Sequence, residues 1–344
     1  MHKTVHFNIS QINELPNGSS GGGLMDLEQK AIERIQTASE MSLNYYKKPL
    51  VCTYSGGKDS DVMLELFRRS GVPFEVHHSH TTVDAPQTVY HIRDVFKKLE
   101  AEGIKCEISM PKLTMWQLIV KKKMPPTRLV RYCCAYLKEN DCRNRMIATG
   151  VRWDESRNRA NRGGYETLMK NKADKVVLSD DDMSDIQTEK DFKQLTIPGV
   201  GSALMLMNDN SKKRRFIERC EMKAKTVCNP IIDWKDKDIK DYIESEKICM
   251  NPLYRMGFNR CGCIGCPMAG KHRYFEFSIF PTYERAYKRA FNKMLDVMKA
   301  DGTGRAPKWK NGEEVFLRWM DDKNIPGQMT LDDFMKNVTE HRLE

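Results

Sequence analysis

The fold is decided by a stretch that runs Pro49-Leu50-Val51-Cys52-Thr53-Tyr54-Ser55-Gly56-Gly57-Lys58-Asp59-Ser60. Its first half has the apolar pattern of a buried strand, and an amphipathic helix pattern follows over 61–69, ended by Gly71. The two glycines let backbone amides converge with no Cβ in the way, and the helix N-terminus adds partial positive charge. The stretch therefore predicts a phosphate-binding loop at a strand–helix junction.

The polar residues of this loop have the chemistry that phosphate binding needs. Ser55 and Ser60 can donate to phosphate oxygens, and Lys58 supplies a mobile cation. Asp59 can orient Lys58 or hold Mg²⁺. The G-x-x-x-x-G-K-[ST] pattern of Walker-type loops is absent. A glycine turn that only caps a helix is the competing interpretation, and the complete string argues against it. The predicted nucleotide-binding residues of the loop are Ser55, Gly56, Gly57, Lys58, Asp59 and Ser60.

Strand and helix patterns alternate after the loop. Strands are predicted over 74–79, around 105–109 and over 146–151, and a helix over about 88–102. Alternation at this interval implies right-handed crossovers and a mostly parallel sheet. The expected fold class is α/β, a Rossmann-like doubly wound sheet with a helical C-terminal part, in which the pattern is strongly helical from Pro281 onward.

Composition divides the chain into three parts. Residues 1–24 contain the Gly/Ser-rich run 17–23 and are predicted to be a disordered tail or a linker left by a fusion. Residues 25–268 are predicted to form one nucleotide-binding domain, in which about 155–225 is a charged, irregular insertion. Residues 269–344 are predicted to form a helical extension.

The net charge of +10 and the pI near 9.0 favour a polyanionic partner, either a nucleotide or a nucleic acid. A solubilising surface is the alternative, and the basic runs 121–123 and 212–215 are assigned to solvated helix faces. No stretch approaches the ~18 apolar residues of a membrane-spanning helix. The first residues lack a secretory signal pattern. A cytoplasmic protein with no membrane partner is expected, and the oligomeric state is left open.

Eleven cysteines, an odd number, argue against a disulfide framework in a chain without a secretory signal. Most are scattered and are assigned to the apolar interior. Two groups are clustered, Cys133-Cys134 and Cys261-x-Cys263-x-x-Cys266. Soft thiolates of this kind bind zinc or iron–sulfur clusters.

Four further segments, together with the loop, resemble the family of phosphoadenosine phosphosulfate (PAPS) reductases and N-type ATP pyrophosphatases. The resemblance implies an adenine nucleotide alpha-hydrolase-like fold whose loop binds the phosphates of an adenylyl nucleotide, here ATP with Mg²⁺. The first segment, Thr82-Val83-Asp84-Ala85-Pro86-Gln87-Thr88, is a shortened form of the family's segment. The other three are Ala148-Thr149-Gly150-Val151-Arg152-Trp153-Asp154-Glu155-Ser156-Arg157, Asn229-Pro230-x-x-Asp233-Trp234 and Asn251-Pro252-Leu253-Tyr254-x-x-Gly257-Phe258.

The resemblance also implies roles for residues outside the loop. Asp84 is expected near the nucleotide, and Arg152, Asp154 and Arg157 are expected to reach its phosphates or the substrate. Arginine suits this role because its guanidinium can hold phosphate through two parallel hydrogen bonds. A surface ion pair is the alternative for Arg152 and Asp154. The expected catalytic residues are Lys58, Asp59, Arg152 and Asp154.

The cysteine pattern is similar to the CC…CxxC of assimilatory adenylylsulfate reductases, which implies a [4Fe–4S] cluster. Adjacent cysteines are awkward for zinc, whose ligands are usually separated by two to four residues, so the cluster is favoured over zinc. Cys261 is an alternative ligand, a free sulfur-carrying thiol or a structural bystander. The expected metal ligands are Cys133, Cys134, Cys263 and Cys266.

The reaction is the least determined part of the prediction. Reductases of this family carry a nucleophilic cysteine in a C-terminal E-C-G-L-H tail, and this sequence has no cysteine after Cys266. That difference favours ATP-dependent sulfur transfer, as in DNA phosphorothioation sulfurtransferases and cluster-bearing tRNA thiolases. A nucleic acid would then be the acceptor, and a cysteine desulfurase or thioredoxin-like protein the sulfur-donor partner. The alternatives are a PAPS or adenylylsulfate reductase and a non-catalytic nucleotide and redox sensor.

Overall fold

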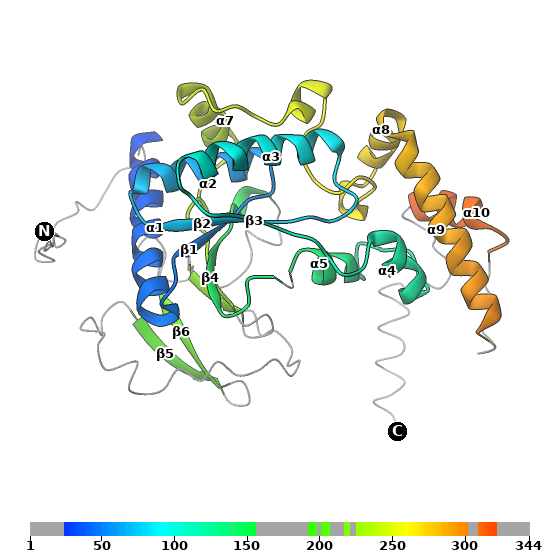
Figure 1. The fold of residues 1–344 in the computed structure, drawn as a ribbon, viewed down its shortest axis with the longest axis horizontal. Helices are drawn as coiled ribbons and strands as arrows, with labels where there is room; N and C mark the ends of the chain where they lie inside the picture. The colour runs from blue at the N-terminus through cyan, green and yellow to red at the C-terminus, as the bar shows by residue number, and fades with distance from the viewer. Residues whose placement is uncertain are drawn as a thin grey trace, which may run out of the picture.

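A computed structural model describes residues 24–139, 141–155, 192–197, 201–206, 217–220, 225–301 and 309–321 (Figure 1). Six strands form one sheet in the order β3-β2-β1-β4-β8-β7. The strands, in sheet order, are β3 (Cys106–Ser109), β2 (Phe74–Ser79), β1 (Leu50–Thr53), β4 (Arg145–Ala148), β8 (Lys225–Cys228) and β7 (Ile217–Cys220).

The sheet is mostly parallel, because the five strands from β3 to β8 share one direction and β7 is an antiparallel edge. The chain fills it outward from β1, first through β2 and β3 on one side and then through β4 and β8 on the other. This reversal creates a switch point at the carboxyl ends of β1 and β4, where ligands bind in open α/β sheets. The predicted Rossmann-like doubly wound class is confirmed, and β2 matches the predicted strand 74–79 residue for residue.

A first hydrophobic core lies between the sheet and the helices of the nucleotide-binding part. In Figure 1, α2 and α3 lie together along one side of the sheet, and α1 packs against α2, β1 and β4. Arg34 of α1 makes two hydrogen bonds to the carboxylate of Asp233, at 2.7 and 2.9 Å, which tie α1 to the turn after β8. The helices are α1 (Leu24–Tyr46), α2 (Lys58–Ser70), α3 (Pro86–Ala101) and α7 (Asp236–Ser245).

The helical C-terminal part forms a second hydrophobic core with two helices that precede it in the chain. Trp319 and Tyr287 lie at its centre, with ring centroids 4.7 Å apart and about 1% of each residue exposed. The same core contains Ile264, so these helices support the cysteine-rich turn directly. The helices are α4 (Met115–Lys122), α5 (Tyr132–Leu137), α8 (His272–Ile279), α9 (Pro281–Ala300) and α10 (Gly312–Met320).

Strands also occur within 155–225, the range predicted to be irregular. β5 (Phe192–Ile197) and β6 (Gly201–Leu206) pair antiparallel, and β7 joins the main sheet. Apart from β5, β6 and β7, residues 156–224 lie outside the described ranges, as do residues 1–23, so the domain boundaries stay predictions. None of the helices in the described ranges combines the length and apolar composition that crossing a membrane requires.

Gly265, between two of the clustered cysteines, is expected to tolerate no side chain. Its φ of +76° lies in the left-handed region, and a Cβ would lie 2.6 Å from Phe277 Cζ and 2.9 Å from Tyr287 Cε2. Gly265→Ala is expected to lower the free energy of unfolding by about 2–4 kcal/mol, because backbone strain and overpacking add. Gly71→Ala is the matched control, because its φ of +70° brings the same strain while nothing lies within 4 Å of the added methyl group. Equal shifts of the two urea unfolding curves would contradict the packing argument.

Candidate nucleotide and cluster site

The predicted phosphate loop, residues 55–60, leaves the carboxyl end of β1 and enters α2 at the switch point. Gly56 has a φ of +71°, and a Cβ there would lie 2.9 Å from Ile92 Cγ1. Gly57 is extended, and a Cβ there would lie 3.4 Å from the Tyr254 hydroxyl oxygen. Gly150, in the turn after β4, is similarly close, because its Cβ would lie 3.2 Å from the Asp59 carbonyl oxygen. The loop is therefore enclosed on several sides, and Gly56 is required by both its backbone and its surroundings.

A segment far along the chain holds the loop in this shape. Asn251 is fully buried, and its Nδ2 donates to the Gly56 carbonyl at 2.9 Å and to Thr88 Oγ1 at 3.1 Å. The Lys58 amide donates to the Tyr254 hydroxyl at 2.8 Å. Because a buried amide without partners is costly, these contacts keep Asn251 and the loop together. Asn251 and Tyr254 thus support the loop rather than form a separate site.

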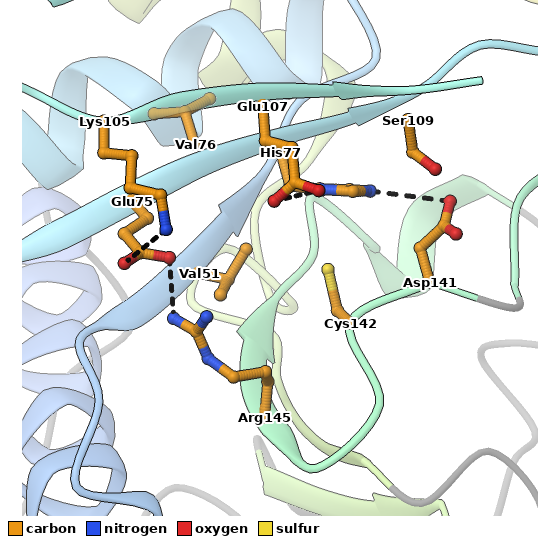
Figure 2. Close-up of a pocket in the computed structure, with 10 residues that line it drawn as sticks. All are labelled: Val51, Glu75, Val76, His77, Lys105, Glu107, Ser109, Asp141, Cys142 and Arg145. Atoms are coloured by element: carbon orange, nitrogen blue, oxygen red, sulfur yellow. Dashed lines mark hydrogen bonds and ion pairs between the residues drawn. The ribbon is translucent and has the colours of Figure 1, made fainter.

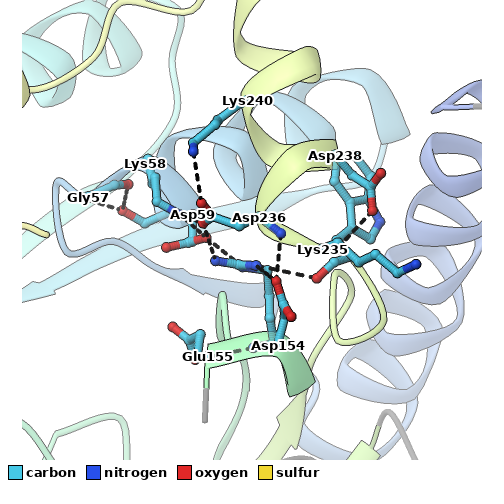
Figure 3. A network of polar contacts seen from close by, with 12 residues as sticks. Gly57, Lys58, Asp59, Asp154, Glu155, Lys235, Asp236, Asp238 and Lys240 are labelled. Atoms are coloured by element: carbon cyan, nitrogen blue, oxygen red, sulfur yellow. Dashed lines mark hydrogen bonds and ion pairs between the residues drawn. The ribbon is translucent and has the colours of Figure 1, made fainter. Parts of the chain in front are cut away.

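Two cations and two carboxylates meet beside the loop (Figure 3). Lys58 Nζ lies 2.6 Å from Asp236 Oδ1 and 3.3 Å from Asp59 Oδ1. Arg152 Nε lies 2.6 Å from Asp59 Oδ1, and its Nη2 lies 3.2 Å from Asp236 Oδ1. Arg152 is only 3% exposed, so these carboxylates, rather than water, balance its charge. Phosphate oxygens could take over the same two cations, and the carboxylates could then share Mg²⁺ with them.

Asp236 belongs to this site although its local sequence does not single it out. It is the first residue of α7, and it reaches the loop because α7 packs against α2. A hydrogen bond from Lys58, helped by one from Lys240, lowers the pKa of Asp236 to about 2. The signal available in the sequence is weak. An acidic residue is favoured in the first turn of any helix because of the helix dipole.

Asp154 acts on the site through its neighbours in this structure. It lies in the short 3₁₀ helix η2 (Trp153–Glu155). Its Oδ2 accepts from the Asp236 amide at 2.8 Å and lies 3.8 Å from Arg152 Nη1. Asp154 therefore positions Asp236 and Arg152, and its expected catalytic role stays a prediction. Arg157, the other residue expected to reach phosphate, lies outside the described residues.

Asp236→Asn is expected to tighten the binding of Mg²⁺-free ATP about threefold to tenfold. The substitution removes a negative charge beside the phosphate position and releases Lys58 from a 2.6 Å ion pair. Asp238→Asn is the matched control on the same helical turn, because Asp238 instead accepts from the Lys235 amide. Isothermal titration calorimetry without magnesium measures both variants. Weaker binding by Asp236→Asn than by the control would contradict this role.

Asp84 lies with the cysteines. It forms an isolated β-bridge with Cys263, and the Ile264 amide donates to the Val83 carbonyl at 2.8 Å. Its carboxylate accepts from the amide and the hydroxyl of Thr81, both at 2.7 Å. These contacts place Asp84 between the end of β2 and the cysteine-rich turn. Its expected role near the nucleotide stays a prediction.

The four cysteines expected to hold metal come together from two segments. Cys133 and Cys134 lie on α5, and Cys263 and Cys266 lie on the turn supported by the second core. A hydrogen bond to Cys134 raises the pKa of Cys133, and so do burial and the charges of the other three thiols. The same hydrogen bond lowers the pKa of Cys134, and so does Arg131, whose Nη2 lies 3.2 Å from Cys134 Sγ. The thiols therefore share one environment that contains a fixed cation.

The sulfurs of these cysteines are not spaced as four ligands of a single zinc ion would be. Zinc with Zn–S bonds of about 2.3 Å brings its four sulfurs to about 3.8 Å from one another. The four cysteines all lie in the described part of the chain, and no three of their sulfurs lie within 4.8 Å of one another. The ammonium of Lys138 adds a second cation, and the nearby charges of Cys263 and Asp84 raise its pKa. The residues present fit a [4Fe–4S] cluster held by four thiolates.

Cys261 lies against the phosphate loop instead. Its Cβ lies 3.7 Å from the position that a Cβ on Gly57 would take, and the Tyr254 hydroxyl is close enough to influence the pKa of its thiol. Burial raises the pKa of Cys261 to about 12, so the group is a neutral thiol near pH 7. The Tyr254 hydroxyl thus accepts from the Lys58 amide and lies near this thiol. Of the three interpretations of Cys261, the geometry favours a free thiol over an alternative ligand.

The sequence pattern of a known domain covers the whole of this site. A profile of the phosphoadenosine phosphosulfate reductase domain matches residues 49–269, which include the loop, Arg152 and all five clustered cysteines. The chain belongs to this family. This match confirms the family resemblance found in the sequence. It includes the strands on both sides of the switch point.

Two curated proteins are similar to this PAPS reductase-family chain at low identity. An uncharacterized protein of Methanocaldococcus jannaschii is 24% identical over 296 residues, which are 86% of this chain and 50% of that protein. The match to a second uncharacterized protein from the same organism covers 58% of that protein. The chain therefore spans about half the length of the curated relatives it matches.

Two solved structures give TM-scores below 0.5, so neither likeness carries an argument about function. PAPS reductase from Candida auris, in a phosphate complex, has a TM-score of 0.41 at 16% identity, over 72% of this chain and 98% of that chain. The U34-tRNA thiolase of Methanococcus maripaludis, with its [4Fe–4S] cluster, has a TM-score of 0.38 at 12% identity, over 88% and 82% of the two chains.

The six-stranded sheet also lines a separate cavity of about 130 Å³ (Figure 2). His77 lies in its wall between two carboxylates, with Nε2 3.5 Å from Asp141 Oδ2 and Nδ1 3.9 Å from Glu107 Oε2. Arg145 pairs with Glu75 at 2.9 Å on the same wall. The charged groups of this cavity compensate one another, which is typical of a structural ion-pair network.

Proposed function

We propose that this protein is an ATP-dependent sulfurtransferase that carries a [4Fe–4S] cluster. The observation that carries the proposal is the position of Cys261, whose half-buried thiol adjoins the phosphate loop two residues before the first cluster cysteine of its segment. In this proposal Lys58 and Arg152 hold the phosphates of ATP, while Asp59 and Asp236 share Mg²⁺ with them. The cluster, held by four thiolates, would supply a thiophilic and redox-active iron centre near that thiol.

The first proposed step activates the acceptor. An acceptor oxygen forms a bond to the α-phosphorus of ATP, and the bond from that phosphorus to the bridging oxygen breaks. Pyrophosphate leaves with the bonding electron pair, and the positive charges of Lys58 and Arg152 stabilise the charge that develops on it. The loop and its cations therefore act on the phosphates alone, which is what their geometry suits.

The second proposed step exchanges oxygen for sulfur. Sulfur at the oxidation level of sulfide attacks the acceptor carbon, and AMP leaves with the former acceptor oxygen, so no reductant is needed. If the sulfur arrives as a persulfide on Cys261, the attack leaves a disulfide between Cys261 and the acceptor. A second thiol must then reduce it, and a thioredoxin-like partner would supply that thiol. A cysteine desulfurase is the kind of partner that would supply the persulfide.

A single set of assays tests this proposal. The wild type is expected to form pyrophosphate from ATP and to transfer radiolabelled sulfur to bulk tRNA or DNA. Cys261→Ser is expected to keep ATP binding, pyrophosphate formation and iron, and to lose sulfur transfer. ATP binding without any pyrophosphate would indicate a sensor instead. Sulfite release from adenylylsulfate or PAPS with thioredoxin would indicate a reductase.

A nucleic-acid acceptor is favoured by a groove of about 440 Å³ between α4 and α9. Its apolar floor includes Trp116 and Ala290, and Lys121, Arg289 and Lys293 contribute cations. An aromatic ring among lysines and arginines suits a stacked base with its phosphates alongside. The net charge of +10 agrees with such a partner. The double substitution of Arg289 and Lys293 by glutamate should therefore abolish tRNA binding at low salt, and unchanged binding would contradict this acceptor.

A further inference from the structure

Three potential metal ligands lie at the carboxyl end of β2, outside the cysteine set. They are His78, the last residue but one of that strand, and His80 and Asp84 in the turn that follows. One ligand atom from each lies within 4.8 Å of the others, and in the described part of the chain no other three His, Cys, Asp or Glu residues meet that condition. Two imidazoles and one carboxylate at this separation are a donor set that divalent transition metals prefer.

His78 presents a nitrogen lone pair that the protein leaves without a partner. Its Nδ1 lies 2.9 Å from the Tyr54 carbonyl oxygen, which can only accept, so the proton of the neutral ring lies on Nδ1. The other nitrogen, Nε2, is buried and has no hydrogen-bond partner. A buried polar atom without a partner costs about 1–3 kcal/mol, so this arrangement calls for an explanation. A metal-binding histidine commonly donates its second nitrogen to a backbone carbonyl in this way.

The other two ligands are held in place by the turn. Asp84 is 7% exposed, and its carboxylate is fixed by two hydrogen bonds from Thr81, both at 2.7 Å. His80 Nδ1 lies 3.2 Å from Asp84 Oδ2. A simple ion pair would explain His80 and Asp84, but it leaves the buried Nε2 of His78 unexplained. A cation at the centre of the three groups explains all of them.

We propose that His78, His80 and Asp84 bind one divalent transition-metal ion, of the kind represented by Zn²⁺ or Fe²⁺. Three protein ligands leave coordination positions open, which is the arrangement of catalytic rather than structural sites. Mg²⁺ is disfavoured because it prefers oxygen ligands. Lys138 is the nearby positive charge that would repel the ion, because its charge interacts with Asp84 as well as with Cys263. The thiolates that would hold the cluster would balance the charge of Lys138.

The site is joined to the cluster cysteines through a short chain of contacts. Cys263 Sγ donates to Thr81 Oγ1 at 3.3 Å, and that hydroxyl donates to Asp84 Oδ1 at 2.7 Å. Asp84 is also bridged to Cys263 through the backbone. The metal site and the cysteine set are therefore neighbours with separate ligands. This proposal does not depend on the reaction proposed above, because it concerns ion binding alone.

Cobalt binding to the anaerobically purified 344-residue protein, with its cluster in place, tests the site. We expect one Co²⁺ per chain, with ligand-field absorption but without the sulfur-to-cobalt charge-transfer bands that thiolate ligands give, and with Zn²⁺ displacing it. His78→Asn removes Nε2 while its amide can still donate to the Tyr54 carbonyl, and it is expected to weaken Co²⁺ binding about 100-fold or more. His77→Asn is the matched control, because His77 lies next to it on the strand and lines the separate cavity.

Three outcomes would contradict the proposed metal site. The first is equal Co²⁺ affinity of His78→Asn and His77→Asn. The others are a cobalt spectrum with thiolate bands alone, and no binding of Co²⁺ or Zn²⁺ by the wild type. A melting curve without metal checks that the His78 variant folds. If it does not fold, His80→Ala replaces it, because 19% of the His80 side chain is exposed and its loss leaves the core intact.

Discussion

Lys58→Ala is expected to weaken ATP binding about 10-fold to 100-fold while the protein remains folded. The reason is that Lys58 supplies the mobile cation of the loop, and a hydrogen bond to a charged group contributes about 1.5–3 kcal/mol, where 1.4 kcal/mol corresponds to a factor of ten. The side chain of Lys58 is 15% exposed and contacts carboxylates rather than the core, so its loss leaves packing unchanged. Isothermal titration calorimetry with ATP and Mg²⁺ measures the effect.

Lys240→Ala is the matched control for this substitution. Lys240 Nζ also pairs with Asp236, at 3.2 Å, but 66% of its side chain is exposed. A general loss of positive charge would weaken binding in both variants, whereas a direct phosphate contact affects Lys58 alone. Unchanged ATP affinity of Lys58→Ala would remove the basis for assigning residues 55–60 as a phosphate loop.

Cys263→Ser is expected to remove the iron and the brown colour of anaerobically purified protein. Cys263 is half-buried at its backbone bridge to Asp84. Desolvation raises the pKa of its free thiol to about 11, so a ligand role needs a bound metal to displace the proton. A serine hydroxyl is a much poorer ligand for iron than a thiolate. Iron and sulfide content and the visible absorption spectrum measure the loss.

Cys261→Ser supplies the control within the same turn. Cys261 lies against Gly57 and the Tyr254 hydroxyl, so this variant is expected to keep its iron. Loss of iron in both variants would return Cys261 to the ligand set. A colourless wild type that carries one zinc ion per chain would contradict the cluster itself, as the separation of the sulfurs opposes a single zinc.

Much of the fold follows from local patterns. The strands β1 and β2 and the helix α3 appear at or near their predicted places, since alternation and amphipathicity are properties of a few consecutive residues. The prediction of strands is less accurate in the charged range 155–225. β5 and β6 form a hairpin in a range predicted to be irregular, because their pairing depends on contacts between two segments rather than on either segment alone.

Some residues of the candidate site can be found from local sequence, and others only from the tertiary structure. The loop and the cysteine groups can be found in the sequence because glycines, a lysine and thiols stand close together in it. Asp236 cannot be found this way, because its role depends on α7 lying against α2, and its pKa of about 2 depends on Lys58, which is 178 residues away. Likewise, nothing local distinguishes His78 from His77. Only the direction of each side chain from β2 separates them.

The sequence by itself determined the fold class, and it predicted the phosphate loop and the five cysteines available for chemistry, since each depends on residues that are neighbours in the chain. Tertiary structure alone decided how those residues are grouped. It brought Cys261 to the loop and Asp84 to Cys263, and it joined Lys58 to Asp236. The physical reason is that hydrogen bonds and ion pairs act over a few ångströms, and the packing of helices on the sheet sets which distant residues come within that range.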